Sequence, residues 1–119
     1  MNALLISDVH ANLEALEAVL DDAGRRGFDE LWFLGDAVGY GPDPNACVER
    51  LLALEPAVWL AGNHDWAALG KLDLAAFNPE ARLATEWTQA RLRPDLSAVL
   101  DALKPRVDAP ERGLIWVHG

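Results

Sequence analysis

The chain has 119 residues, of which 51% are hydrophobic and 24% are charged. This balance is typical of one soluble globular domain and excludes an intrinsically disordered chain. The formal net charge of −9 argues against a stable complex with nucleic acid and against binding to an acidic membrane. No apolar run approaches the ~20 residues that cross a bilayer. The first residues contain no basic region, so no secretory signal is expected. A single cysteine, Cys47, permits no internal disulfide and predicts a cytoplasmic location.

The first half of the chain alternates short apolar runs with segments of helical periodicity, the pattern of an α/β fold. Strands are expected at residues 3–6, 31–34 and 57–60. A first helix is expected to begin at Asn12, a good N-cap, and to end at Gly24 or Gly27. A second helix should open at Asp43-Pro44, because proline is favoured at the first helical position.

The second half of the chain predicts two more helices and a hairpin. Both helices open on a proline, and they are expected at residues 79–92 and 94–103. A turn at residues 110–113 should join residues 106–107 to a last apolar strand at 114–117. Because the first three strands are apolar throughout, they should be covered on both faces, as in a parallel sheet. The predicted fold class is therefore α/β, a layered βαβ sheet flanked by helices.

Polar residues follow the predicted strands, and all three histidines of the chain lie at such positions. The four strand ends run into Ser7-Asp8-Val9-His10, Gly35-Asp36, Gly62-Asn63-His64-Asp65 and His118-Gly119. Ligands of parallel sheets gather at the carboxyl ends of the strands. We therefore expect one cleft at the carboxyl edge of the sheet, containing Asp8, His10, Asp36, Asn63, His64 and His118.

These side chains suit metal ions. Carboxylate, imidazole and amide groups bind Mn, Fe, Zn or Ni, and the absence of cysteine from every motif excludes a thiolate site. Asp36 could bridge two cations with its two oxygens, and two cations about 3.5–4 Å apart can clamp a phosphoryl group. Gly35 and Gly62 would let the backbone bend sharply at the ends of their strands.

In order, these four motifs resemble the first four motifs of the calcineurin-like metallophosphoesterases. The stretch Gly-Asp-Ala-Val-Gly-Tyr-Gly-Pro at residues 35–42 resembles small prokaryotic members described as phosphodiesterases or as diadenosine tetraphosphatase-like. The resemblance covers the whole chain and implies the N-terminal half of that family's α/β sandwich. It implies a dinuclear metal-dependent phosphoesterase, which hydrolyses phosphomonoesters or phosphodiesters by attack of a metal-bound hydroxide. The implied substrate is a small phosphorylated molecule, either a nucleotide or a phosphodiester.

The resemblance also implies the ligands of two divalent or trivalent cations, with manganese preferred over iron, zinc and nickel. Asp8 and His10 would bind the first cation, Asn63 and His118 would bind the second, and Asp36 would bind both.

Two neighbouring residues would then act without binding metal. The resemblance implies that His64 stabilises the phosphate or protonates the leaving oxygen. Asp65 would orient His64, or alternatively would cap the short segment that follows it.

One departure from the family concerns its fifth motif, Gly-His-x-His, which is absent because no histidine follows His118. This predicts a single domain over residues 1–119, truncated after the fourth motif. An alternative function is therefore a catalytically weak or silent fragment that binds metal and self-associates. We also expect a homo-oligomer, because an apolar face would lose part of its cover; its residues are Leu5, Phe33, Trp59 and Trp116.

Related phosphatase classes fit less well. Protein serine/threonine phosphatases of the superfamily have an arginine after Gly-Asp, where this chain has Val-Gly-Tyr at 38–40. Haloacid-dehalogenase-type phosphatases need Asp-x-Asp after the first strand, whereas the chain has Asp-Val-His at 8–10. Phosphoacceptor domains need a lysine at a strand end, and the two lysines, Lys71 and Lys104, lie elsewhere.

Overall fold

The computed structural model describes all of residues 1–119. Its helices and strands are, in chain order, β1 (Ala3–Ile6), α1 (Leu13–Arg26), β2 (Glu30–Phe33), α2 (Pro44–Ala53), β3 (Val58–Trp59), α3 (Asn63–Ala68), α4 (Pro79–Arg91), α5 (Pro94–Asp101), β4 (Arg106–Ala109) and β5 (Leu114–Val117). Two single-turn 3₁₀ helices occupy Leu74–Ala76 and Pro110–Arg112. None of the helices has the length and apolar character needed to cross a membrane.

The predicted helix boundaries are largely confirmed, because local capping chemistry sets them. The Asn12 side chain accepts a hydrogen bond from the Ala15 amide at 3.0 Å and so caps α1. The helix ends at Gly27, whose φ of 80° is typical of a C-terminal glycine, while Gly24 lies inside it. In the same way, the Asn78 side chain caps α4.

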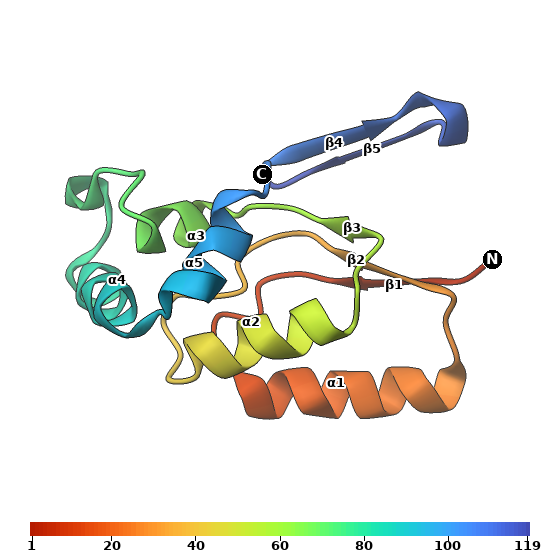
Figure 1. Ribbon diagram of the computed structural model, residues 1–119, viewed down its shortest axis with the longest axis horizontal. Coiled ribbons are helices and arrows are strands. Elements are labelled where there is room, and N and C mark those ends of the chain that lie inside the picture. The colour runs from red at the N-terminus through yellow and green to blue at the C-terminus, as the bar shows by residue number, and fades with distance from the viewer.

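The sheet that positions the site has three parallel strands in the order β1-β2-β3. Successive right-handed crossovers in one direction place both connecting helices on the same side of a sheet. Figure 1 shows α1 and α2 packed together below the sheet, with the β4–β5 hairpin above it. The layered α/β fold is therefore confirmed, with helices on one face and a hairpin on the other.

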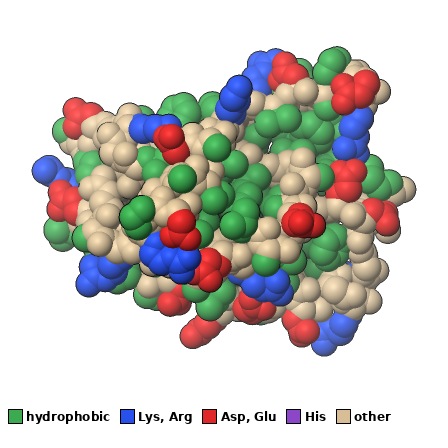
Figure 2. Space-filling model, in the orientation of Figure 1, with side chains coloured by type: hydrophobic (Ala, Val, Ile, Leu, Met, Phe, Trp, Pro, Cys, Tyr) green, Lys and Arg blue, Asp and Glu red, His purple; other side chains and the backbone are tan.

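Alternation along β2 divides the core between these two faces. Leu31 and Phe33 are buried in the larger cluster, with residues of α1, α2 and α5. Trp32 packs against the smaller cluster, which joins β3 to the hairpin and includes Leu60 and Trp116. On the face drawn in Figure 2, hydrophobic side chains gather between the hairpin and the helices, and charged side chains lie around them.

The hairpin that the sequence predicts for the last strand is confirmed. β5 pairs with β4 in a separate antiparallel hairpin and does not belong to the parallel sheet. One isolated bridge, between Leu60 and Lys104, connects the hairpin region to the end of β3. Packing of the hairpin across the sheet covers Trp116, which is only 6% exposed, whereas Ile115 and Val117 stay exposed on the outer face.

The expectation of an open apolar face is mostly wrong. Phe33 is fully buried under the helices, Trp116 is covered against β2 and β3, and Trp59 packs against the helix-side cluster. Only Leu5 is exposed, at 55%, because the hairpin covers β2 and β3 but not β1. β1 is also an edge strand of the sheet.

Candidate metal centre

The loop that follows β1 and the loop that follows β2 are joined by backbone hydrogen bonds beyond the ends of the strands. The Asp8 amide donates to the Gly35 carbonyl at 2.9 Å, and the His10 amide donates to the Asp36 carbonyl at 3.0 Å. The Ala11 amide continues the series with a bond to the Ala37 carbonyl at 2.8 Å. These bonds place the first predicted motif directly beside the second.

Several residues of these loops have left-handed backbone conformations. The φ angles are 57° at Asp8, 49° at His10 and 63° at Asp36. Such conformations cost about 1–3 kcal/mol each for a residue other than glycine, and they persist where surrounding bonds enforce them. Their concentration at three predicted ligands is typical of a functional site.

The first group of ligands is Asp8, His10 and Asp36, whose ligand atoms all lie within 4.8 Å of one another. His10 Nε2 is 3.4 Å from Asp8 Oδ1 and 3.7 Å from Asp36 Oδ2. His10 Nδ1 lies 3.0 Å from the Val38 carbonyl oxygen. Because a carbonyl only accepts, we assign the proton to Nδ1, which leaves the Nε2 lone pair facing both carboxylates.

The second group contains Asp36, Asn63 and His118. His118 Nε2 lies 3.4 Å from Asp36 Oδ2 and 3.3 Å from Asn63 Oδ1. His118 Nδ1 is 2.6 Å from the Leu34 carbonyl oxygen, so the same argument assigns the proton to Nδ1. Both histidines therefore present Nε2 to Asp36, and a backbone carbonyl holds each ring in place.

Asp36 lies between the two groups and is 2% exposed. Its Oδ1 accepts a hydrogen bond from the His64 amide at 2.9 Å, so Oδ2 alone faces both histidines. The sequence led us to expect that each oxygen would serve one cation, and the hydrogen bond at Oδ1 changes that expectation. Burial raises the pKa of Asp36, although the His64 amide and the two histidines oppose the rise.

Two glycines allow this close packing. A Cβ at Gly62 would overlap Asp36 Oδ1 and the Asp36 backbone nitrogen. A Cβ at Gly35 would lie 2.6 Å from His118 Nδ1, and Gly35 has a φ of 104° that other residues rarely adopt. The two groups of ligands can therefore meet only where both positions lack a side chain.

His64 lies beside the first group, and its ring contacts other aromatic rings. The ring centroid is 4.9 Å from that of His10, 4.8 Å from that of Tyr40 and 5.2 Å from that of Phe77. Its Nδ1 is buried without a hydrogen-bond partner. Burial, together with the neighbouring His10, lowers the pKa of His64.

Asp65 is fully buried, and its carboxylate accepts four backbone hydrogen bonds. The donors are the amides of Asp36, Ala37, Val38 and Gly62, at 2.9–3.2 Å. Asp65 is the third residue of α3 and bonds back to Gly62, the residue before that helix, in a capping box. Burial raises the pKa of Asp65 to about 6, against the effect of the amides of Gly62, Val38 and Asp36.

The expectation that Asp65 orients the His64 ring is therefore not met. Both of its oxygens are taken by backbone amides, and the His64 Nδ1 has no partner. The alternative of a cap is closer to the structure, although the N-cap residue is Gly62 and the helix begins at Asn63.

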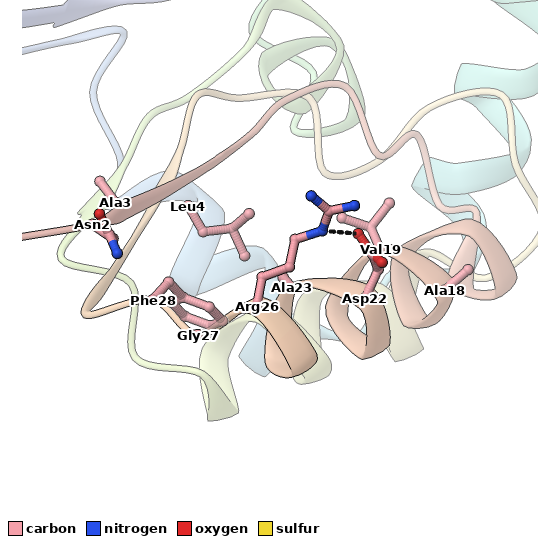
Figure 3. A pocket seen from close by; sticks show the side chains of 10 residues that line it. All are labelled: Asn2, Ala3, Leu4, Ala18, Val19, Asp22, Ala23, Arg26, Gly27 and Phe28. Carbon is pink, nitrogen blue, oxygen red and sulfur yellow. Dashed lines mark hydrogen bonds and ion pairs between the residues drawn. The ribbon is translucent and has the colours of Figure 1, made fainter.

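A polar groove of about 470 Å³ opens beside the first group of ligands. It is lined by residues that include Asp8, His10 and Tyr40, and the Tyr40 side chain is half exposed there. A second groove of about 390 Å³ is more apolar and lies between α1 and β1 (Figure 3). That groove contains none of the predicted site residues. The polar groove therefore reaches Asp8 and His10, and a smaller pocket of about 140 Å³ reaches Asn63 and His118.

The donor set fits divalent cations. Two carboxylates, one amide oxygen and two imidazole nitrogens converge around Asp36 Oδ2, and sulfur takes no part. Fold and site together define an α/β protein with a candidate metal centre at the strand ends.

Comparison with known proteins identifies the family. The family model for calcineurin-like phosphoesterases matches residues 1–108, and the chain belongs to this family. An uncharacterized protein of Methanocaldococcus jannaschii is 44% identical over 116 residues, which cover 96% of this chain and 47% of that protein. A symmetrical bis(5'-nucleosyl)-tetraphosphatase of Shewanella baltica is 34% identical over 120 residues, covering 95% and 41%. The crystal structure of a metallophosphoesterase from Sphaerobacter thermophilus matches with a TM-score of 0.77 and 51% identity, covering 92% and 44%.

The chain thus spans about half the length of the curated relatives it matches. The family match includes Asp8, His10, Asp36 and Asn63 but ends before His118. The place of His118 in the site therefore depends on the geometry of this structure, in which it contacts both Asp36 and Asn63.

Proposed function

We propose that this chain is a metal-dependent phosphoesterase whose site takes two cations. Asp8 and His10 would hold one cation, Asn63 and His118 the other, and Asp36 would contribute to both. The observation that carries the proposal is the position of Asp36 Oδ2, which faces the Nε2 atoms of His10 and His118 at 3.7 and 3.4 Å. Cations bound there would polarise a phosphoryl group and supply the nucleophile.

The chain's own residues would then bind and orient the substrate. The polar groove admits a phosphate ester to the first group of ligands, with Tyr40 at its side. The His64 ring borders the same ligands through its contact with His10 and would hold the phosphate or donate a proton to the leaving oxygen. Asp65 would act indirectly, by fixing the loop that carries Asp36.

We propose a small nucleotide or another phosphodiester as the substrate class, and manganese as the preferred metal. The tetraphosphatase name of the Shewanella baltica relative supports a nucleotide-like phosphate. Oxygen and imidazole donors without thiolate suit manganese. The acidic chain, at −9, disfavours a long polyanion as substrate.

The test is to measure metal content and hydrolysis of bis(p-nitrophenyl) phosphate after loading with Mn²⁺. The proposal expects two cations per chain and hydrolysis that a chelator removes. Binding of fewer than two cations would reject the dinuclear site. Two cations without hydrolysis would favour the alternative, a silent metal-binding fragment.

Replacing His64 by alanine should separate metal binding from turnover. The His64 ring lies beside the ligands without making a hydrogen bond through Nδ1, so metal content should stay near the unmodified level. Turnover should fall roughly 10²–10⁴-fold, as expected for a lost general acid. His118→Ala is the matched comparison, because it should remove one cation. Equal metal loss in the two variants would assign His64 to the ligands instead.

We also propose that the chain self-associates through the open side of β1. Leu5 is 55% exposed there, and the strand edge has no partner. Sedimentation velocity should therefore detect a dimer or larger species, and Leu5→Ser should shift it toward monomer. Leu83→Ser is the control, because Leu83 is exposed on α4, away from that edge. A monomer at high protein concentration would contradict the proposal.

A further inference from the structure

His118 comes from the hairpin, so something must hold the hairpin in register with the sheet. Along β5 the side chains alternate: Trp116 is 6% exposed, whereas Ile115 and Val117 are 58% and 54% exposed. With the period of two in a strand, Trp116 and His118 lie on the same face. The packing of Trp116 therefore bears directly on where the His118 ring lies.

Trp116 packs against the parallel sheet through Trp32 of β2. The two ring centroids are 5.2 Å apart at an interplanar angle of 77°, an edge-to-face contact. Trp116 also belongs to the buried cluster that contains Val58 and Leu60 of the β3 region. The packing of Trp116 thus holds the middle of the hairpin against the sheet.

Arg112, in the turn of the hairpin, joins the hairpin to the sheet at the end far from His118. It makes a two-pronged contact with Glu30 at the start of β2, at 3.1 and 3.2 Å. Its guanidinium carbon lies 5.6 Å from the Trp32 ring centroid and 5.9 Å from that of Trp116. Glu30 in turn accepts a hydrogen bond from Trp32 Nε1 at 3.1 Å. We call Glu30, Trp32, Arg112 and Trp116 the clasp.

The opposite end of the hairpin is held by backbone bonds near the site. The Ala61 amide donates to the Lys104 carbonyl at 2.8 Å, and the His118 amide donates to the Pro105 carbonyl at 3.0 Å. His118 has one further tie, from Nδ1 to the Leu34 carbonyl. Leu34 directly follows β2, the strand that also carries both sheet residues of the clasp.

We infer that the clasp sets the position of the His118 ring, so that Arg112 and Trp116 are positioning residues for the second cation. The cation part of this inference depends on the proposed function. The clasp part concerns this chain alone, because the clasp locks the hairpin to β2 and β2 ends at the carbonyl that orients His118. Arg106 offers a matched control on the same hairpin, since it pairs with Asp108 within its own strand.

The first experiment is made without metal. Long-range ¹⁵N–¹H correlation spectra report the ring nitrogens of His118 and His10 separately. In Arg112→Ala the His118 signals should shift or broaden while the His10 signals stay in place, and Arg106→Ala should change neither. In Arg112→Lys the change in the His118 signals should be smaller than in Arg112→Ala, because lysine keeps the charge but loses the two-pronged contact. Unchanged His118 signals, or equal changes at His10, would overturn the inference.

The second experiment titrates the same variants with Mn²⁺ by calorimetry. Arg112→Ala should weaken one of the two sites about three- to tenfold, the effect expected of a partly exposed ion pair and a cation–π contact together. Trp116→Phe, which keeps an aromatic ring, should weaken the same site, and Arg106→Ala should weaken neither. Wild-type affinity at both sites in Arg112→Ala and Trp116→Phe would overturn the inference. If the unmodified chain bound fewer than two cations, the dinuclear proposal would fail, and the metal-free spectra would still decide the role of the clasp.

Discussion

Replacing Asp36 by asparagine is expected to remove at least one of the two proposed cations and to lower phosphodiester hydrolysis about 10³-fold. The estimate follows because a cation contributes several kcal/mol to stabilising a phosphoryl transition state, and 1.36 kcal/mol is tenfold in rate. Asp36 Oδ2 is the one atom that faces both histidine Nε2 atoms. An amide at this position would lose the negative charge shared by the two groups of ligands.

The same substitution should leave the fold intact, which makes the result interpretable. The oxygen of the new side-chain amide can still accept the hydrogen bond that the His64 backbone amide donates to Asp36 Oδ1. The substitution also removes a buried charge, so the metal-free variant should unfold at or above the temperature of the unmodified chain. Calorimetry with Mn²⁺ and a thermal melt are the two measurements.

Asp43→Asn provides the control for loss of one carboxylate in the same groove. Asp43 lines the groove but makes no side-chain capping bond to α2. Its replacement should leave two cations bound. If Asp36→Asn also retained two cations and full hydrolysis, Asp36 would not be the shared ligand, and the dinuclear arrangement would be wrong.

The gathering of the candidate site residues at one edge of the sheet could be predicted because it depends on local pattern. Short apolar runs mark β1, β2 and β3, and the residues after each run fall at one edge of a parallel sheet. Capping residues such as Asn12 and Asn78 fix the ends of the helices by bonds three residues away. Both kinds of information are contained in a few neighbouring residues.

The hairpin of the last strand could be predicted from its turn, but its packing against the sheet could not. Leu-Ile-Trp-Val at residues 114–117 is as apolar as the strands of the sheet, yet β5 pairs with β4 and packs across β2 and β3. Ile115 and Val117 are exposed, so the apolar composition of this strand does not reveal which of its faces is covered. The position of the hairpin on the sheet depends on contacts such as Arg112 with Glu30, which are 82 residues apart and leave no local pattern.

The role of Asp65 was missed for a similar reason. Its neighbour His64 suggested a pair of catalytic side chains, whereas its partners are amides 27–29 residues earlier and the amide of Gly62. An acidic residue three positions after the glycine that precedes a short helix is a signal for a capping box. That signal could have indicated the Gly62 bond, but not the three bonds to the loop after β2.

Replacing Asp65 by asparagine is expected to destabilise the fold by about 2–6 kcal/mol. The asparagine side chain has one acceptor oxygen, which can serve two of the four amides, and its NH₂ group would face the others. Each buried donor left without a partner costs about 1–3 kcal/mol. A domain of this kind is stable by about 5–15 kcal/mol in total, so the variant would lose a large fraction of its stability.

Chemical denaturation measures this loss, with Asp73→Asn as the matched control. Asp73 is an exposed aspartate that accepts one amide bond, from Ala75 at 2.9 Å, so its replacement should cost about 1 kcal/mol or less. A loss below about 1 kcal/mol for Asp65→Asn would show that the four bonds do not hold the loop. Where the Asp65 variant still folds, it should also bind Mn²⁺ more weakly than the unmodified chain. Its oxygens bond the amides of Asp36, Ala37 and Val38, so releasing that loop moves the carboxylate on which both groups of ligands converge.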